Sequence, residues 1–331
     1  MIKIARLSKN DLQDLFLNTA RHMGVQSAVV EKDFWVCVIL DYLFKKSPWK
    51  TSMAFKGGTS LSKSFNLINR FSEDVDIILD WRLLGYSIKE PWQDRSIRKQ
   101  NSFNKDARRR TEAFLKHSFC PNIQKGLSKV LGNKVEVFID NQNEATVSFA
   151  YPRLFDNSGI LQVIRLEIGV LSAWTPTVST KIEPFIAHHY PSIFENQSTN
   201  VLSVTAERTF WEKATILHRE ANRPKNSKVP QRYARHYYDL YRMSSTPVKT
   251  MAFQQANLLN QVVAFKMKFY HQKWAQYENA IKGTLRLVPP EYRFNELKAD
   301  FNTMRDMLFG NIPTFATIME TLVNLEKEFN V

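Results

Sequence analysis

Two aspartates in the N-terminal third of the chain, Asp74 and Asp76, have the spacing of a metal site. They open the segment DVDIIL at residues 74–79, whose apolar run is typical of a β-strand. Side chains two positions apart on a strand point to the same face, so the two carboxylates converge. Such carboxylates repel each other unless a cation lies between them, and magnesium prefers hard oxygen ligands together with substrate phosphates. We therefore expect a site for one or two Mg²⁺ ions that acts on a nucleoside triphosphate (NTP).

A glycine pair, Gly57 and Gly58, comes shortly before these aspartates. Only 10 of the 331 residues are glycine, so an adjacent pair indicates a turn that needs backbone freedom. The N–H groups of such a turn, with the hydroxyls of Thr59 and Ser60, can hold a phosphate. We expect Lys63, in the first turn of the following helix, to supply a positive charge to the same phosphates.

Glu167 is the candidate for a third metal-binding carboxylate. It lies inside VIRLEIGVL, residues 163–171, where a charge in an apolar strand is costly unless it is paired or bound to metal. Arg165, two residues earlier on the same strand face, would neutralise it without a metal. The residues alone leave both interpretations open.

The elements that position these residues fall into two groups. Mixed patterns come first, with helices expected at about 9–22, 27–46, 60–67 and 95–131, and strands at 52–55, 74–79, 134–140, 144–151 and 161–170. From about residue 200 the pattern is helical, with candidates near 205–221, 231–244, 248–281, 292–309 and 313–329. The stretch between them, 188–200, is rich in loop-forming residues. The sequence predicts an α+β lobe over 1–195 and a mostly helical lobe over 196–331.

The charge balance favours a polyanionic partner. Lys and Arg total 46 against 32 Asp and Glu, a formal net charge of +14, which most often accompanies nucleic-acid binding. Ten of these cations lie within residues 95–129 and six within 219–235. Both stretches could line a groove for a nucleic-acid backbone, or each could be a solvated helix face.

Other classes of protein are disfavoured. Two cysteines, Cys37 and Cys120, form neither a disulfide framework nor a zinc motif. The seven histidines lack metal-site spacing. The first residues have no signal-peptide core, and the longest apolar run, residues 34–40, is too short to span a bilayer. We expect a cytoplasmic protein without a membrane anchor.

Over residues 55–79 the chain resembles the nucleotidyltransferase AbiEii/AbiGii toxin family, a bacterial branch of the polymerase-beta superfamily. The superfamily pattern is Gly-Ser, then a spacer, then Asp-x-Asp. In this chain the glycine turn ends at Ser60, and thirteen residues separate it from the aspartate pair. The motif Arg-x-Ser-x-Asp-x-Asp matches Arg70 to Asp76, which implies nucleotide-binding roles for Arg70 and Ser72. The resemblance implies a polymerase-beta-like N-lobe with a mixed sheet.

The resemblance continues into the helical part. ERTFWEKATILHRE, residues 207–220, implies a phosphate-contacting lysine at Lys213, and RHYYDLYRM, residues 235–243, implies a catalytic carboxylate at Asp239 that orients this lysine or assists the acceptor hydroxyl. EKDFWV at 31–36 is similar to the family's opening helix, whereas residues 245–331 match no motif. From the residues alone, Lys213 could equally lie along an apolar stripe, and Asp239 could pair with Arg235 on a helix surface.

The resemblance also implies a function. It implies a Mg²⁺-dependent toxin that transfers a nucleoside monophosphate from an NTP to an acceptor, foremost the 3′ end of tRNA. A separately encoded antitoxin would counter it, often in phage defence. Two alternatives stay open: a metal-dependent nuclease that uses the same carboxylates without an NTP, and a nucleic-acid-binding module on an inactive transferase scaffold.

Overall fold

The chain folds into two compact units. The computed structural model describes residues 1–140, 143–156, 161–169 and 176–331. Residues Met1–Phe65 and Ser72–Val204 form the first, called here the sheet unit, and Asn66–Phe71 with Thr205–Val331 form the second, the helical unit. The short segment 66–71 therefore leaves the sheet unit and belongs to the helical one, although it lies between the glycine turn and the aspartate pair.

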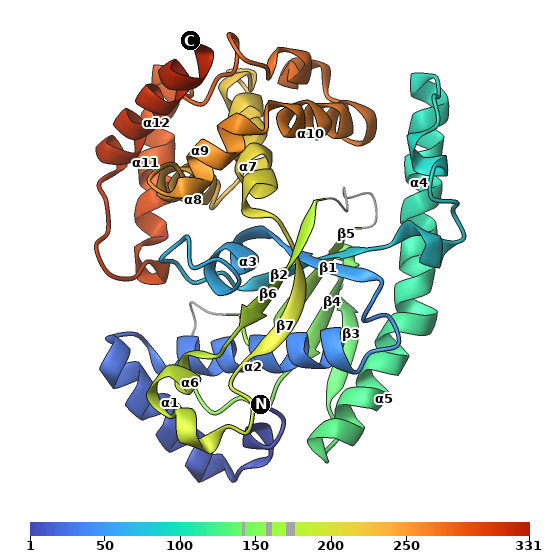
Figure 1. The fold of residues 1–331 in the computed structure, drawn as a ribbon, viewed down its shortest axis with the longest axis vertical. Helices are drawn as coiled ribbons and strands as arrows, with labels where there is room; N and C mark the ends of the chain where they lie inside the picture. The colour runs from blue at the N-terminus through green and yellow to red at the C-terminus, as the bar shows by residue number, and fades with distance from the viewer. Residues whose placement is uncertain (141–142, 157–160, 170–175) are drawn as a thin grey trace. The chain divides into compact units, whose positions relative to one another are not determined.

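In the described residues of the sheet unit, seven strands form one mixed sheet in the order β3-β4-β5-β2-β1-β7-β6 (Figure 1). The β1–β7 and β2–β5 pairs are parallel, and the other pairs are antiparallel. The strands are β1 (Met53–Lys56), β2 (Asp74–Leu79), β3 (Glu136–Asp140), β4 (Asn143–Ala150), β5 (Ile164–Gly169), β6 (Thr177–Ile182) and β7 (Thr199–Val204). The α+β class expected from the sequence is confirmed.

Two strands, β6 and β7, were absent from the sequence expectation. At the edge of the sheet, β6 has side chains that are mostly exposed or half-buried, so it lacks the apolar alternation that marks a strand. Its neighbour β7 begins at Thr199, at the end of the loop-rich stretch 188–200, and most of the strand follows that stretch. The expected lobe boundary at 195/196 precedes β7, and the sheet unit extends to Val204.

Helices cover the sheet. α2 contacts β7 and β5, and almost every residue from Ala28 to Leu43 is buried, while α5 contacts β3 and α4 contacts β4 (Figure 1). The α-helices of this unit are α1 (Lys9–Met23), α2 (Ser27–Lys45), α3 (Gly57–Lys63), α4 (Ile97–Phe114), α5 (Cys120–Leu131) and α6 (Phe185–His189). A π-helical turn, Leu115–Phe119, joins α4 to α5, and 3-10 turns lie at Ile4–Arg6, Trp81–Leu84, Glu90–Trp92 and Pro191–Ile193.

The helix after the glycine pair differs from the expectation of 60–67. α3 begins at Gly57 and ends at Lys63, so Lys63 lies in its last turn and not in its first. Gly57 has a φ of +78°, which lets β1 turn directly into the helix. Thr59 and Ser60 lie inside α3 and do not cap it, because their hydroxyls bind carbonyl groups nearby.

The helical unit contains α7 (Ala206–Ala221), α8 (Ala234–Ser244), α9 (Pro247–Gln254), α10 (Ala256–Phe269), α11 (Phe294–Thr303) and α12 (Phe315–Asn330). Short 3-10 turns lie at Lys273–Ala275, Tyr277–Asn279, Glu291–Arg293 and Arg305–Met307. The single helix expected at 248–281 is therefore wrong. Gln255 leaves the helical region with φ −103° and ψ +52°, which separates α9 from α10.

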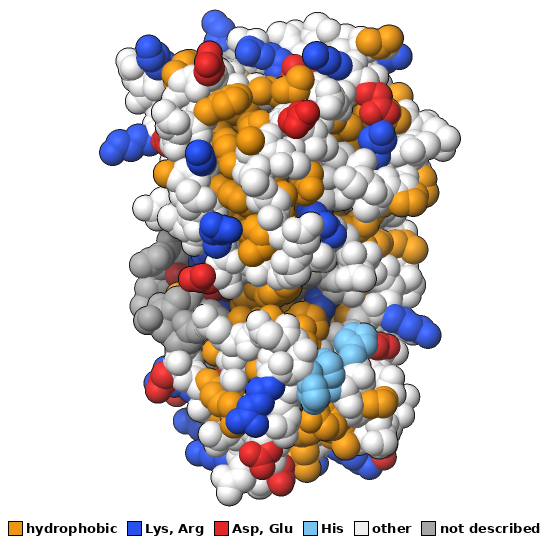
Figure 2. Space-filling model, turned by 90° about the vertical axis from the view of Figure 1, so that its left-hand side faces the viewer, with side chains coloured by type: hydrophobic (Ala, Val, Ile, Leu, Met, Phe, Trp, Pro, Cys, Tyr) orange, Lys and Arg blue, Asp and Glu red, His pale blue; other side chains and the backbone are white. Residues whose placement is uncertain are grey.

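Three further observations concern the cysteines, the length and apolarity of the helices, and the surface. Cys37 and Cys120 are both buried and unpaired. Within the described ranges, no helix is both long enough and apolar enough to cross a membrane. On the face shown in Figure 2, histidine side chains gather at one place, and the rings of His22 and His189 stack with centroids 5.3 Å apart.

Candidate active site

The carboxylates expected to bind metal lie on one face of the sheet. Along β2 the burial alternates, with Val75 and Ile77 directed into the apolar core and Asp74 and Asp76 half-buried on the other side. β5 alternates in the same way, and its half-buried residues are Arg165, Glu167 and Gly169. The parallel β2–β5 register pairs Asp74 with Arg165 and Asp76 with Glu167. Pairing therefore brings Glu167, ninety residues further along the chain, next to the aspartates.

The register extends this polar face across the neighbouring strands. Lys56 of β1 is the Cα partner of Asp76, and Thr146 of β4 is the Cα partner of Glu167. Lys56, Asp76, Glu167 and Thr146 thus form one row across four strands. A cation at one end and a hydroxyl at the other flank the two carboxylates of this row.

The glycine turn lies directly against Asp76. A Cβ atom placed on Gly57 would be 1.9 Å from Asp76 Oδ2 and 2.6 Å from its Cγ. No side chain can be accommodated at such a distance without moving the carboxylate. A glycine is therefore required at position 57 for two reasons: its backbone has a positive φ, and the Asp76 carboxylate approaches it closely.

Thr59 and Ser60 hold this turn together. The Thr59 hydroxyl donates to the backbone carbonyl groups of Asp74 and Ser72, which ties α3 to the start of β2. The Ser60 hydroxyl donates to the carbonyl of Gly57 at 2.9 Å. Both residues are buried, and Gly58 between them and Gly57 is buried too. The expected nucleotide-binding turn is thus a well-connected element beside the aspartate pair, and Ser72 at its side is half-buried.

Asp74 has an oxygen without a hydrogen-bond partner. Its Oδ1 is buried and accepts no hydrogen bond from the described residues, and the nearest ion-pair contact is Arg165 Nη1 at 3.9 Å. The same guanidinium lies 3.4 Å from Asp140 Oδ2 through its Nε. Arg165 thus lies near two carboxylates, those of Asp74 and Asp140, and Asp74 keeps a free acceptor position for another ligand.

These donors fit a hard divalent cation. Magnesium binds carboxylate oxygens, keeps several waters, and commonly takes one or two protein carboxylates together with substrate phosphates. Asp74 and Asp76 supply such a pair, and the unpartnered Oδ1 of Asp74 is a suitable ligand atom. Among the described residues, no group of three or more His, Cys, Asp or Glu side chains is arranged around one point. Glu167 lies in register but does not complete such a group.

Lys63 is engaged within the sheet unit. Its ammonium forms an ion pair with Asp33 of α2, donates to the carbonyl of Glu183 at 2.9 Å and lies 4.0 Å from the ring centroid of Phe185. Burial by itself would lower the pKa of Lys63, but the Asp33 carboxylate raises it. A buried, paired ammonium that anchors α3 to α2 is a structural contact, and the expected role of Lys63 on a phosphate stays a prediction.

A second group of expected site residues lies in the helical unit. Arg70 binds Asp239 through two parallel contacts, Nε to Oδ1 at 2.7 Å and Nη2 to Oδ2 at 2.9 Å. Lys213 Nζ lies 2.7 Å from the same Oδ2. All three side chains are buried, and Asp239 has no exposed surface. The alternative pairing with Arg235 does not describe Asp239, because Arg70 and Lys213 occupy its two oxygens.

Charge compensation explains this burial. Desolvation would raise the pKa of Asp239, but the charges and hydrogen bonds of Arg70 and Lys213 outweigh it and lower this pKa below its usual value. The pKa of Lys213 is lowered, first by burial and then by the Arg70 charge, against the pull of Asp239. One carboxylate thus neutralises only one of two cations, which leaves this cluster with a net positive charge.

His236 is a member of the cluster that the sequence interpretation missed. Its Nδ1 lies 3.2 Å from Lys213 Nζ, and burial followed by the charge of Lys213 lowers its pKa well below the usual value. A neutral imidazole with its proton on Nε2 accepts a hydrogen bond from the lysine at Nδ1. The available signal was its position three residues before Asp239, which places both on neighbouring faces of α8.

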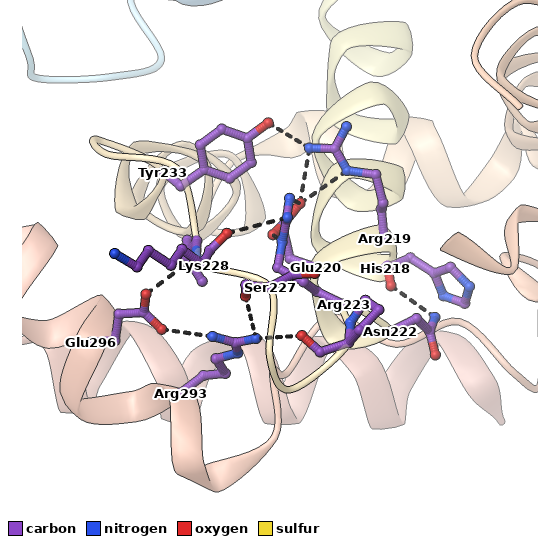
Figure 3. A network of polar contacts seen from close by, with 12 residues as sticks. His218, Arg219, Glu220, Asn222, Arg223, Ser227, Lys228, Tyr233, Arg293 and Glu296 are labelled. Carbon is purple, nitrogen blue, oxygen red and sulfur yellow. Dashed lines mark hydrogen bonds and ion pairs between the residues drawn. The ribbon is translucent and has the colours of Figure 1, made fainter. Parts of the chain in front are cut away.

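The loop that joins α7 to α8 is held by a dense polar network (Figure 3). Glu220 at the end of α7 binds Arg219 and Arg223, and the Arg219 guanidinium also donates to the Tyr233 hydroxyl. Arg293 donates to the carbonyl groups of Pro224, Lys225 and Ser227. These contacts fix the two helices that carry Lys213 and Asp239. Arg219 and Arg223 therefore act as structural cations, which reduces the case for a nucleic-acid groove along 219–235.

Comparison with known proteins gives one family match. The model of the family described as "Nucleotidyl transferase AbiEii toxin, Type IV TA system" matches residues 38–321. No curated protein matches the chain. Among solved structures, JHP933 from Helicobacter pylori is similar at 14% identity over 92% of this chain and 93% of that chain, with a TM-score of 0.43. The nucleotidyltransferase toxin MenT4 from Mycobacterium tuberculosis is similar at 14% identity over 88% and 99%, with a TM-score of 0.42. Likenesses of this size support no conclusion about chemistry, so the family match alone bears on function.

Proposed function

Because the chain belongs to the AbiEii family of nucleotidyltransferase toxins of type IV toxin–antitoxin systems, we propose that it transfers a nucleoside monophosphate from an NTP to the 3′ end of tRNA with magnesium. One observation carries the assignment of the site. Asp74 and Asp76 share the polar face of β2, with Asp76 packed on Gly57 and one oxygen of Asp74 unpartnered. A carboxylate pair that can hold magnesium, beside a turn that can hold phosphates, suits phosphoryl transfer from a triphosphate.

Each residue has a proposed role. Asp74 and Asp76, with Glu167 as a third carboxylate, hold the metal, and the turn from Gly57 to Ser60 holds the triphosphate. A magnesium ion bound there would neutralise the phosphates and stabilise the charge of the leaving pyrophosphate. Arg70, Ser72 and Lys63 remain proposed nucleotide contacts, although Arg70 and Lys63 are each paired in this structure. Lys213 would contact phosphate, oriented by Asp239.

The proposed reaction is a single displacement. The 3′-hydroxyl oxygen of the acceptor forms a bond to the α-phosphorus of the NTP. The bond from that phosphorus to the bridging oxygen breaks, and pyrophosphate leaves with the electron pair, while the hydroxyl proton passes to water. The protein contributes by positioning the two substrates and by compensating charge. The net charge of +14 supports a polyanionic acceptor such as tRNA, and we expect the proposed reaction to take place in the cytoplasm.

The biological setting is part of the proposal. Membership of a type IV toxin–antitoxin family implies an antitoxin, which we expect to be encoded separately. Loss of acceptor activity in tRNA would stop translation, and such an arrest suits a role in phage defence. Expression of the active protein without its antitoxin should therefore halt growth, whereas the double aspartate variant described next should not.

The test is transfer of label from each α-³²P-NTP to total tRNA with magnesium. The protein and an Asp74→Ala/Asp76→Ala variant would run side by side, with thermal unfolding as the check that both are folded. We expect label on tRNA that falls roughly 100-fold or more in the variant, because the variant lacks its metal-binding oxygens. Equal labelling by a folded variant would contradict the assignment of the site.

The same assay separates the alternatives. RNA cleavage that needs magnesium but no NTP, and that is lost in the variant, would favour a nuclease. Absence of both reactions, together with tight RNA binding, would favour a binding module on an inactive scaffold. Chelation with EDTA should abolish transfer and addition of magnesium should restore it.

A further inference from the structure

α4, the π-helical turn and α5 form a continuous helical segment over residues 97–131 (Figure 1). At about 1.5 Å per residue, its length is on the order of 50 Å. Its buried residues include Ala107, Leu115, Ile123 and Leu127, so one side packs on the sheet unit. The opposite side is exposed along the whole segment.

This exposed side carries cations that have no ion-pair partner among the described residues. None of seven exposed side chains forms an ion pair within the described part of the chain: Arg98, Lys99, Lys105, Arg108, Lys116, Lys125 and Lys129. The segment contains only two carboxylates, Asp106 and Glu112. Asp106 is already engaged by Arg109, Arg110 and the Tyr86 hydroxyl. We call the exposed side of residues 97–131 the basic ridge.

Cations of α4 and of the π-helical turn are ordered along one line. Arg98, Lys105, Arg109 and Lys116 follow each other at intervals of seven, four and seven residues, which return to the same face of a helix. The buried residues Gln100, Ala107 and Thr111 mark the opposite face. On the face in Figure 2, lysine and arginine side chains are scattered among carboxylates and apolar side chains.

One end of the ridge presents an aromatic ring. Trp92 is 41% exposed and ends the 3-10 turn Glu90–Trp92, which comes before α4 in the chain. Arg95 holds this turn in place, since it donates to the carbonyl groups of Glu90 and Gln93 and stacks on Phe103. Within the described part of the ridge beyond Ile97, no large hydrophobic side chain is exposed. Protein partners usually need such apolar anchors in the middle of an interface, whereas a phosphate backbone does not.

We propose that the basic ridge binds the sugar-phosphate backbone of the RNA acceptor, with Trp92 as a platform for an unpaired base at its end. The inference rests on the proposed function for the identity of the acceptor, and it adds the surface that selects RNA. Phosphates replace the missing counter-charges of the ridge, and base stacking on an exposed indole adds affinity without sequence preference. Binding at the ridge lowers the KM for RNA without taking part in the chemical step.

The test compares two triple variants of equal net charge. Arg98→Glu/Lys105→Glu/Lys116→Glu reverses the ridge, and Lys9→Glu/Lys282→Glu/Lys298→Glu reverses three exposed, unpaired lysines elsewhere. Binding of fluorescent tRNA without NTP would be measured by anisotropy from about 50 to 200 mM salt. We expect the ridge variant to lose at least about tenfold in affinity and its salt slope to fall by about 2. The control should change less than threefold.

Two further measurements make the outcome decisive. Trp92→Ala should weaken binding of a single-stranded oligonucleotide more than binding of a duplex, and Trp92→Phe should restore it. If the ridge variant misfolds, the milder Lys105→Gln/Lys116→Gln variant, checked by thermal unfolding, replaces it. Unchanged affinity in a folded ridge variant, or equal loss in the control, would overturn the inference. Equal affinity for polyglutamate would also overturn it, because the ridge would then recognise charge alone.

The failure of the inference differs from the failure of the proposed function. If tRNA is labelled normally by the ridge variant with an unchanged KM, the transferase stands and the ridge does not. If the ridge binds tRNA but no RNA is ever labelled, the ridge stands and the proposed acceptor chemistry is wrong. A higher KM for tRNA with unchanged kcat in the ridge variant supports both.

Discussion

At the scale of single residues, the approach of Asp76 to Gly57 is the tightest constraint on the site. The carboxylate occupies the space that any side chain at position 57 would need. This contact explains why a chain with few glycines has one here. It also makes Gly57 a positioning residue for the metal-binding carboxylate.

We predict that Gly57→Ala lowers transfer about 100-fold, because the added methyl group must push Asp76 out of position. Gly283→Ala is the matched control. Gly283 has a φ of +92° and nothing within 4 Å of an added Cβ, so it incurs the backbone strain of about 1 kcal/mol without the clash. Steady-state transfer and thermal unfolding of both variants would be compared. Equal losses of activity in the two variants would contradict the role of the contact.

At the scale of elements, α2 buries charged residues as well as apolar ones. Glu31 is fully buried and accepts hydrogen bonds from the backbone N–H groups of Leu154 at 2.6 Å and Phe155 at 3.3 Å. Next to it, Asp33 binds Lys63 and the N–H of Phe185. The polar side of α2 thus fixes three separate parts of the sheet unit, which an apolar helix of the same length would not.

Glu31 predicts a specific pH dependence of stability. Burial raises its pKa from 4.5 to about 7, so the folded protein retains a proton that the unfolded chain releases above pH 4.5. The stabilising contribution of the neutral Glu31 carboxyl group is therefore present below pH 4.5 and is lost as the pH rises through about 7. We expect the free energy of unfolding of the protein, relative to Glu31→Gln, to fall by on the order of 2 kcal/mol between pH 5 and pH 8. Urea unfolding of both proteins at pH 5 and pH 8 measures this difference in free energy. A difference that is the same at both pH values would refute the raised pKa of Glu31.

At the scale of the whole molecule, the chain crosses between its two units more than once. Segment 66–71 belongs to the helical unit, where Phe71 N–H donates to the carbonyl of Met307, Phe309 N–H donates to that of Asn69, and Arg70 binds Asp239. Both ends of the segment continue into the sheet unit. The glycine turn and the aspartate pair are therefore joined through a piece of the helical unit.

Because Asp239 is shared by Arg70 and Lys213, removing its charge and removing the charge of Lys213 should affect stability differently. Asp239→Asn leaves Arg70 and Lys213 buried without a counter-charge, so we expect a loss of about 3–5 kcal/mol of stability. Lys213→Met leaves the bidentate Arg70–Asp239 pair intact, so it should cost far less stability while transfer is lost. Urea unfolding and the tRNA-labelling assay measure both. A Lys213→Met protein that is folded and fully active would exclude Lys213 from the reaction.

Local patterns allowed much of the site to be predicted. Alternation along DVDIIL predicted β2 and the common face of Asp74 and Asp76, because strand periodicity depends only on neighbouring residues. The glycine pair predicted a turn for the same reason, and helical periodicity predicted α1, α2 and α7 to within a few residues. The helix expected at 95–131 corresponds to α4, the π-helical turn and α5 together. The strong basic charge of residues 95–129 was equally visible in the sequence.

Contacts between distant residues were decided by the tertiary structure alone. Strand pairing placed Glu167 beside Asp76, and Asp33 took up Lys63, neither of which follows from spacing along the chain. Arg70 and Asp239 are 169 residues apart and meet because segment 66–71 joins the helical unit. A local pattern indicates which face of its element a side chain occupies. The partner of that side chain depends on which elements pack together, and burial of the whole core determines this packing.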